Sequence, residues 1–84
     1  MTEQTLDLVG LVRTLVEPII EYKDDLEILE SEQGDDARLI EVRVNDEDTG
    51  KVIGRQGRVI KAIRTIARAA ASRAGEHVDV ELLD

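Results

Sequence analysis

Glycine and basic residues alternate over residues 50–58, which read GKVIGRQGR. Gly54 and Gly57 enclose two long polar side chains, and because glycine has no Cβ, the backbone can turn sharply there and approach a ligand closely. An apolar, alanine-rich helical pattern follows directly, and backbone N–H groups at the start of a helix attract anions. Basic side chains would add positive charge around the loop: Lys51, Arg55 and Arg58. This combination predicts a phosphate-binding loop.

The positive charge of the chain is concentrated around this loop. The 84 residues carry a net charge of -8, which by itself would argue against a nucleic-acid partner. Seven of the 11 Lys and Arg residues nevertheless fall within residues 51–73, where there is no Asp or Glu, so all 19 acids lie elsewhere. This segregation favours a face that binds something anionic, although a solvated basic helix face that balances acidic neighbours would give the same pattern.

The composition excludes several classes of protein and site. Without cysteine there is neither a disulfide framework nor a thiolate metal site, and His77, the single histidine, cannot form a metal site alone. We therefore expect no metal and no cofactor. The length predicts one domain over residues 1–84. No apolar run reaches the roughly 20 residues needed to span a bilayer and no signal peptide is evident, so we expect a soluble, cytoplasmic protein that does not contact membranes.

The first element that could support the loop is an amphipathic helix over residues 5–22. Its apolar residues recur at spacings of three and four, which is typical of a helix with one buried face. Thr5 or Asp7 could cap its start, and Pro18 predicts a bend or a new first turn near Glu17. The residues expected in the core are Leu8, Val9, Val12, Leu15, Val16 and Ile19.

Three segments with a period of two predict strands. Residues 26–33 and 39–45 alternate on either side of a turn at residues 34–36, which predicts a hairpin, and residues 77–82 alternate again near the end. In the second segment Ile40, Val42 and Val44 share one face, while Glu41 and Arg43 occupy the other. A polar second face indicates a sheet that helices cover on one side only.

Two helices are expected on either side of the glycine loop. Asp48 or Thr49 could cap a very short helix at residues 51–53, and a long helix over residues 58–74 would stop at Gly75. Its small residues would allow close approach by the sheet or by a helix of a second subunit. The predicted apolar stripe consists of Val59, Ile60, Ile63, Ile66, Ala67 and Ala70. The opposite side carries Arg58, Lys61, Arg64 and Arg68.

The segment VIGRQGR at residues 52–58, lying between two helices, resembles the V-I-G-x-x-G segment of KH domains. The order helix, strand, strand, short helix, long helix, strand is similar to the type II KH arrangement. The whole chain resembles the small bacterial RNA-binding proteins of the KhpA family. This resemblance implies an α+β fold of the order α-β-β-α-α-β, in which three helices pack on one face of a three-stranded sheet.

The resemblance also implies a mechanism, in which the loop clamps the backbone of about four unpaired RNA nucleotides while the bases lie on an apolar floor. Arg55 and Gln56 would reach across the phosphates. The floor would be formed by Val52, Ile53 and Ile60, together with an apolar residue of the strand at residues 39–44. The implied RNA-binding residues are Lys51, Val52, Ile53, Gly54, Arg55, Gln56, Gly57, Arg58, Ile60 and Lys61.

The same resemblance implies partners and a cellular role. It implies a homodimer, or a heterodimer with a larger KH-containing RNA-binding protein of the KhpB type. It also implies an RNA chaperone or post-transcriptional regulator that affects cell-envelope growth and cell shape. Tyr22 is the only aromatic residue, so aromatic stacking platforms are excluded. The acidic segment at residues 46–48 predicts modest, salt-sensitive binding.

Other functions fit the residues less well. The Walker pattern fails because Gly50-Lys51 is followed by Val52, and the dinucleotide fingerprint fails because Val52 stands where a glycine is required. No Ser, His and Asp arrangement stands out, and no cysteine nucleophile exists, so we expect no enzyme activity. One alternative stays open: an interaction module whose main role is dimerisation, with a partner that makes most of the RNA contacts.

Overall fold

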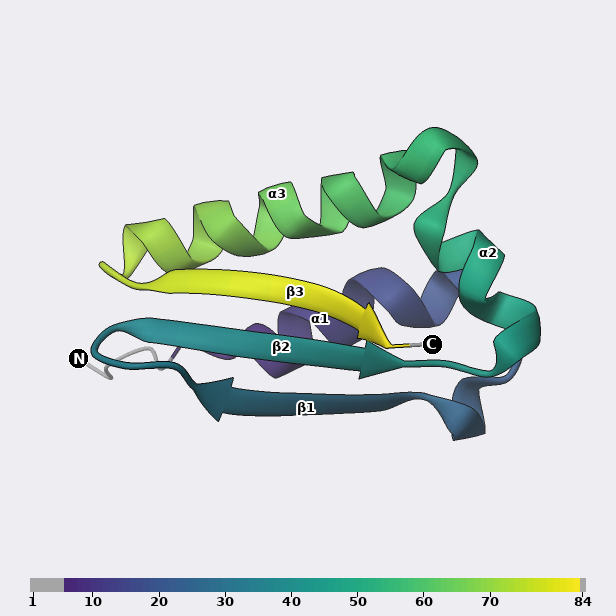
Figure 1. Cartoon of the computed structure of the whole chain (residues 1–84), viewed down its shortest axis with the longest axis horizontal. Coiled ribbons are helices and arrows are strands. Elements are labelled where there is room, and N and C mark those ends of the chain that lie inside the picture. Colours follow the sequence, from purple (N-terminus) through teal and green to yellow (C-terminus); the bar gives the residue numbers. More distant parts are fainter. Residues whose placement is uncertain (1–5, 84) are drawn as a thin grey trace.

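The computed structural model describes residues 6–83, which form three helices and three strands (Figure 1). In chain order these are α1 (Leu8–Val16), β1 (Glu27–Glu32), β2 (Ala37–Arg43), α2 (Thr49–Ile53), α3 (Arg58–Arg73) and β3 (His77–Leu83). The predicted α+β order is confirmed. Within residues 6–83, none of the helices has the length and apolar character that crossing a bilayer would require.

The three strands form one mixed sheet in the order β1-β2-β3. β1 and β2 are an antiparallel hairpin, with Ile28 opposite Val42. β2 and β3 are parallel, with Ile40 opposite Val80, so the chain has to return along the whole sheet between them. It does so through α2 and α3 (Figure 1).

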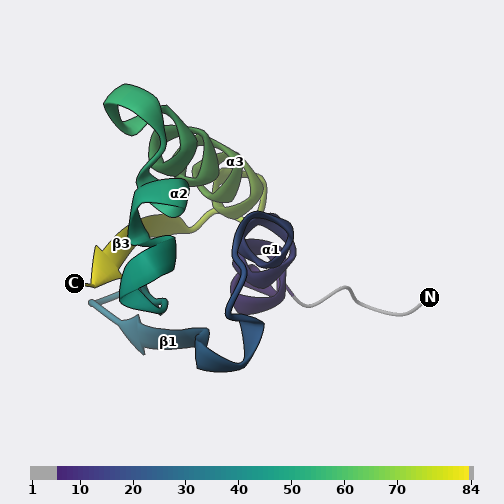
Figure 2. The same ribbon diagram turned by 90° about the vertical axis from the view of Figure 1, so that its right-hand side faces the viewer.

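The core lies between the sheet and the helices, which cover one face. Figure 2 shows α1 and α3 next to each other on the same side of the sheet. Ile40, Val42 and Val44 are buried, as their alternation predicts, whereas Leu29 on the other face is 50% exposed. The fully buried or nearly fully buried residues of the helices are Leu8, Val12 and Val16 in α1, Val52 in α2, and Ile60, Ile63, Ala67 and Ala71 in α3.

The first helix is shorter than the sequence pattern predicts. α1 ends at Val16, and a separate 3₁₀ turn follows at Glu17–Ile19, with Pro18 in its first turn. Proline has no backbone N–H to continue the helical hydrogen bonds, so the new turn that Pro18 predicts is present. At the other end, Asp7 caps α1, because its Oδ1 accepts a hydrogen bond from the Gly10 N–H at 2.9 Å. Thr5, the other candidate cap, lies outside the described residues.

α3 ends where the sequence predicts, but its buried side is narrower than the predicted apolar stripe. Gly75 has a φ of 75°, and the Glu76 N–H returns to the Ala71 carbonyl at 2.9 Å, which is a glycine-based helix stop. Ile66, however, belongs to the predicted apolar stripe and is 44% exposed. The buried stripe of α3 is narrower than the apolar stripe in the sequence, so Ile66 lies outside it.

Truncation of a side chain to alanine should destabilise the protein more on the covered face of the sheet than on the open face. We expect Ile40→Ala to lower the free energy of unfolding by about 2–5 kcal/mol, because a fully buried side chain leaves a cavity. Leu29→Ala, on the open face, should change it by less than about 1 kcal/mol. Urea denaturation of both variants measures the difference, and equal losses would contradict the assignment of faces.

Candidate functional site

The glycine loop is a short, well-defined turn between α2 and α3, at one end of the molecule (Figure 1). Gly54 ends α2 with a φ of 76°, and its N–H donates to the Gly50 carbonyl at 2.9 Å. A 3₁₀ turn follows at Arg55–Gly57, in which the Gly57 N–H donates to the Gly54 carbonyl at 3.1 Å. α3 then begins at Arg58. The loop is therefore held by its own backbone.

The two glycines of the loop are required for different reasons. A Cβ on Gly54 would collide with the Val59 side chain and lie 2.8 Å from the Val59 backbone nitrogen. At Gly57 the nearest atom to an added Cβ would be Lys61 Cε at 3.9 Å, so the space is open. Gly57 is favoured instead by its left-handed backbone, with a φ of 74°. Gly54 thus sets the packing of the loop on α3, and Gly57 sets the direction in which α3 starts.

The two residues between the glycines are both exposed. Gln56 has a φ of 58°, a left-handed conformation that costs a non-glycine residue about 1–2 kcal/mol. Its Oε1 accepts a hydrogen bond from Arg58 Nη2 at 3.0 Å. Among residues 6–83, the Arg55 side chain has neither a hydrogen-bond nor an ion-pair partner, while its carbonyl accepts the Arg58 N–H. Strained backbone beside a free guanidinium is typical of a site that contacts a ligand.

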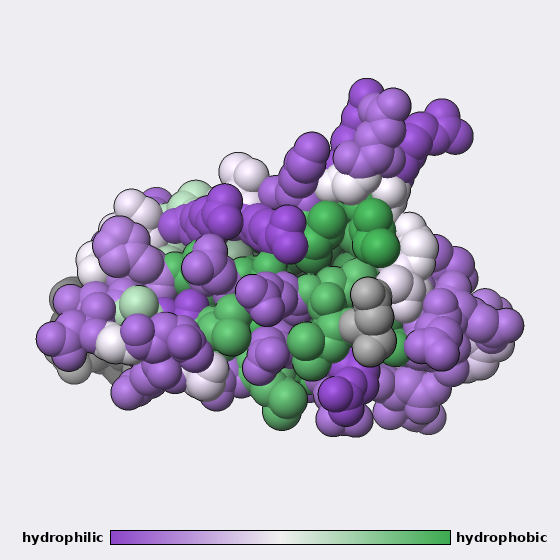
Figure 3. Space-filling view, in the orientation of Figure 1, coloured by the Kyte–Doolittle hydropathy of each residue, from purple (hydrophilic) through white to green (hydrophobic). Residues whose placement is uncertain are grey.

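The apolar surface below the loop differs in detail from the predicted floor. Val52 has no exposed surface and Ile60 is 7% exposed, so Val52 supports the floor from beneath rather than lining it. Ile53 is 38% exposed and does reach the surface. Figure 3 shows an apolar area below the loop, over the start of α3 and the end of β3. The half-buried apolar residues of those elements are Val59, Leu82 and Leu83.

The strand beside the loop also differs from the prediction. An apolar residue of the strand at residues 39–44 was expected in the floor, but that strand is β2, in the centre of the sheet. β3 is the strand that packs against α3, and it lies at the sheet edge. Ile40 and Val42 of β2 are buried in the core. The strand that contributes to this surface is therefore β3.

Several basic residues of residues 51–73 are bound within the protein. Lys51 Nζ lies 3.3 Å from Asp48 Oδ1 and 3.6 Å from Glu21 Oε2, and the hydrogen bond to Asp48 raises the pKa of Lys51. Arg64 Nε donates to the Val80 carbonyl at 2.8 Å, and Arg68 Nη2 lies 3.2 Å from Asp79 Oδ1. These two contacts join α3 to β3. Lys61 is exposed, and its ammonium group, like the Arg55 guanidinium, has no partner among the described residues.

Asp48 does not act as the predicted N-cap. It occupies the N-cap position of α2, yet its side chain accepts no capping hydrogen bond from the backbone of that helix. Its oxygens instead accept the backbone N–H groups of Glu21 and Tyr22, at 3.0 and 2.9 Å. Burial alone would raise the pKa of Asp48, but these hydrogen bonds and Lys51 outweigh it and hold the pKa below its ordinary value. Asp48 therefore stays charged inside the fold.

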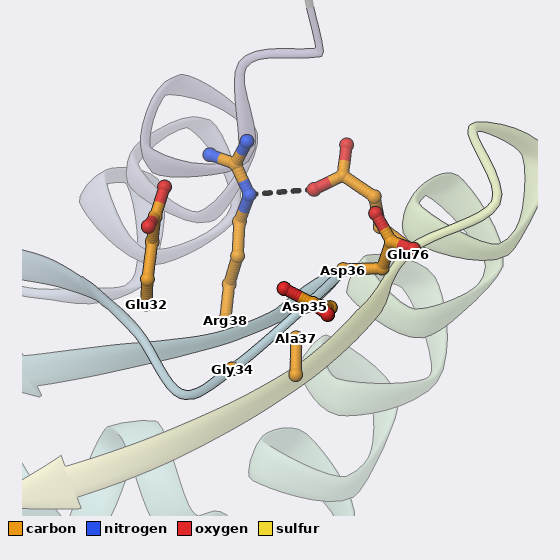
Figure 4. Close-up of a pocket in the computed structure, with 7 residues that line it drawn as sticks. All are labelled: Glu32, Gly34, Asp35, Asp36, Ala37, Arg38 and Glu76. Atoms are coloured by element: carbon orange, nitrogen blue, oxygen red, sulfur yellow. Dashed lines mark hydrogen bonds and ion pairs between the residues drawn. The ribbon is translucent and has the colours of Figure 1, made fainter.

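The hairpin turn, at the other end of the molecule from the glycine loop, is acidic. Figure 4 shows a hollow beside the hairpin turn, where Arg38 Nε lies 2.6 Å from Glu76 Oε1. Apart from Arg38 its charged lining is acidic, and it consists of Glu32, Asp35, Asp36 and Glu76. In the described part of the chain no cluster of His, Cys, Asp or Glu is arranged to hold a metal ion. Phosphate groups would be repelled at this end and attracted at the loop.

Comparison with known proteins assigns the fold. The sequence model of the KH domain of KhpA and KhpB matches residues 10–82. The chain belongs to the KhpA/KhpB family of KH domains. The three helices and the mixed three-stranded sheet are thus a KH fold, and the G-x-x-G segment of that fold falls at residues 54–57.

Relatives in this family match over almost their whole length. "RNA-binding protein KhpA" of Bacillus subtilis is 38% identical over 84 residues, which is 100% of both chains. The protein of the same name from Caldanaerobacter subterraneus is 41% identical over 73 residues, covering 87% of this chain and 96% of the relative. Among solved structures, an Era variant of Aquifex aeolicus bound to GDP.AlF4- gives a TM-score of 0.62 at 23% identity. It covers 96% of this chain and 31% of Era, and shares the fold.

Substitution by alanine should destabilise the protein more at Gly54 than at Gly57. Gly54→Ala should lower the free energy of unfolding by about 2–5 kcal/mol, because it adds a collision with Val59 to the left-handed strain. Gly57→Ala should cost about 1–2 kcal/mol, since only the strain applies. Thermal or urea unfolding of the two variants makes the comparison, and a larger loss for Gly57→Ala would contradict this account of the loop.

Proposed function

We propose that this protein binds single-stranded RNA at the loop of residues 54–57. The observation that carries the proposal is the exposed Arg55 guanidinium, which has no partner among residues 6–83 and lies on a strained glycine turn beside an apolar area. Relatives that are named RNA-binding proteins support the choice of RNA. The proposed activity is binding, without catalysis and without a cofactor.

The shape of the site favours unpaired nucleotides. Aliphatic side chains such as Ile53 can contact a base only when the base is unstacked and turned outward, which a duplex does not allow. In the proposed complex, Arg55 and Gln56 contact backbone phosphates, and Arg58 and Lys61 add positive charge along the same strand.

The number of basic residues around the loop whose charge no acidic side chain compensates limits the affinity. Three phosphate contacts, from Arg55, Arg58 and Lys61, correspond to a slope of about -2 for log affinity against log salt concentration on a single strand. The net charge of -8 opposes approach of RNA from a distance. Binding is therefore modest and sensitive to salt, and two sites acting on one RNA strand would strengthen it.

Dimerisation is the second part of the proposal. Ile66 is 44% exposed, and the small exposed residues Ala62 and Ala69 share its side of α3 at helical spacing. This surface would let another helix approach closely, from a second copy or from a larger KH protein of the KhpB type. Family membership supports a role as an RNA chaperone or post-transcriptional regulator in the cytoplasm, with an effect on cell shape. The alternative is that the partner makes most of the RNA contacts.

A double charge reversal in the loop tests the RNA site. Arg55→Asp with Gln56→Asp should reduce affinity for a short labelled single-stranded RNA by at least about tenfold at low salt, because two phosphate contacts become repulsive. The matched control is Arg13→Asp with Thr14→Asp, an exposed pair on α1. Fluorescence anisotropy measures both, and circular dichroism checks the fold. Unchanged affinity in the folded loop variant would refute the site.

A single substitution on α3 tests the dimer. Ile66→Arg should convert a dimer to a monomer, because it places a charge in the proposed apolar contact. Leu29→Arg adds the same charge on the open face of the sheet, where Leu29 is 50% exposed, and should leave the mass unchanged. Light scattering after size exclusion measures the mass. If Ile66→Arg alone removes RNA binding while the loop variant keeps it, the alternative function is correct.

A further inference from the structure

Asp48 is the buried charged residue of the described chain, with a relative exposure of 0%. Isolation of a carboxylate from water is costly unless hydrogen bonds and an opposite charge compensate it. Here Oδ1 accepts from the Glu21 N–H and from Lys51 Nζ, and Oδ2 accepts from the Tyr22 N–H. Both oxygens of this buried carboxylate are thus hydrogen-bonded, at the start of the helix that leads to the proposed RNA site.

The contacts of Asp48 join two segments that are far apart in the sequence. Glu21 and Tyr22 follow the Pro18 turn, 27 and 26 residues before Asp48. A second contact lies close to the first, because Asn45 Nδ2 donates to Asp25 Oδ2 at 2.9 Å. Together they fix the start of α2 to the connection between α1 and β1.

This attachment matters because α2 cannot position itself. It has five residues, and a helix of that length has little stability of its own. Val52 anchors its middle in the core, and Gly54 ends it at the loop. The orientation of the loop relative to the apolar area therefore depends on what holds the start of α2, and Asp48 supplies two of the three hydrogen bonds that do so.

Lys51 is part of the same arrangement. Its ammonium group lies between the carboxylates of Asp48 and Glu21, so its charge is compensated within the protein. The sequence resemblance implies that Lys51 attracts RNA, whereas this geometry makes Lys51 a partner of the buried acid.

We propose that Asp48 is a positioning residue for the RNA site. It orients α2, and through α2 the loop of residues 54–57, and it keeps Lys51 in an internal ion pair rather than on a phosphate. This inference rests on the proposed function, because it assigns a role relative to RNA bound at that loop.

The test compares Asp48→Asn with Val78→Ala. Asn has the size of Asp but lacks the charge, and its amide group would meet a backbone N–H. We expect RNA affinity to fall about tenfold under conditions where the variant is folded, since the loop would be competent in a smaller fraction of molecules. Hydrogen exchange at the Glu21 and Tyr22 amides should accelerate. Val78→Ala perturbs the core at the other end of β3 and should keep wild-type affinity once folded.

A second measurement does not depend on the folding of Asp48→Asn. Lys51→Met should leave the slope of log affinity against log salt unchanged, whereas Lys61→Met should reduce its size by about 0.7, the value for one phosphate contact. An equal reduction for both variants would overturn the internal ion pair. Equal affinities of folded Asp48→Asn and Val78→Ala would overturn the positioning role.

The loop variant Arg55→Asp with Gln56→Asp is measured in the same assay. If that variant binds RNA normally, the proposed function itself fails. If it loses binding while Asp48→Asn keeps wild-type affinity, the RNA site stands and only the positioning role of Asp48 is wrong.

Discussion

The parallel pairing of β2 and β3 is the constraint on which the rest of this structure depends. Two parallel neighbours cannot be joined by a tight turn, so the chain must leave the end of β2 and return to the start of β3 along the sheet. α3 makes that return over Arg58–Arg73, and the short α2 and the glycine turn precede it. The turn therefore lies where the chain reverses, at the end of the molecule, with its polar residues exposed.

Basic and acidic side chains gather at different turns of the chain. The hairpin turn at the other end carries acidic residues around Arg38, whereas the loop and the first turns of α3 carry Arg55, Arg58 and Lys61. A chain with a net charge of -8 can in this way present a basic loop, even though the acidic turns Lys23–Asp25 and Asp46–Asp48 lie near the start of α2 at the same end. Not every basic residue of residues 51–73 faces the loop, because Arg64 and Arg68 contact β3 and join it to α3.

Local patterns predicted the elements better than the contacts between them. The alternation of Ile40, Val42 and Val44 identified the buried face of β2, and the spacing of Gly54 and Gly57 identified the loop, because both depend on neighbours in the sequence. The partners of Asp48 come from residues 26 and 27 positions earlier, which no local pattern specifies. The placement of β3 beside α3 and the exposure of Ile66 depend likewise on how the helix lies on the sheet, which periodicity alone does not determine.

The contact between Arg64 and the Val80 carbonyl has a consequence for assembly. The His77 N–H points inward to Asp36, and backbone groups alternate along a strand, so the Val80 carbonyl lies on the outer edge of β3. The guanidinium covers that edge and blocks the addition of another strand there. At the other edge, β1 carries Glu27, Glu30 and Glu32, whose like charges oppose pairing between copies. Both edges of the sheet thus carry features that oppose strand-to-strand aggregation.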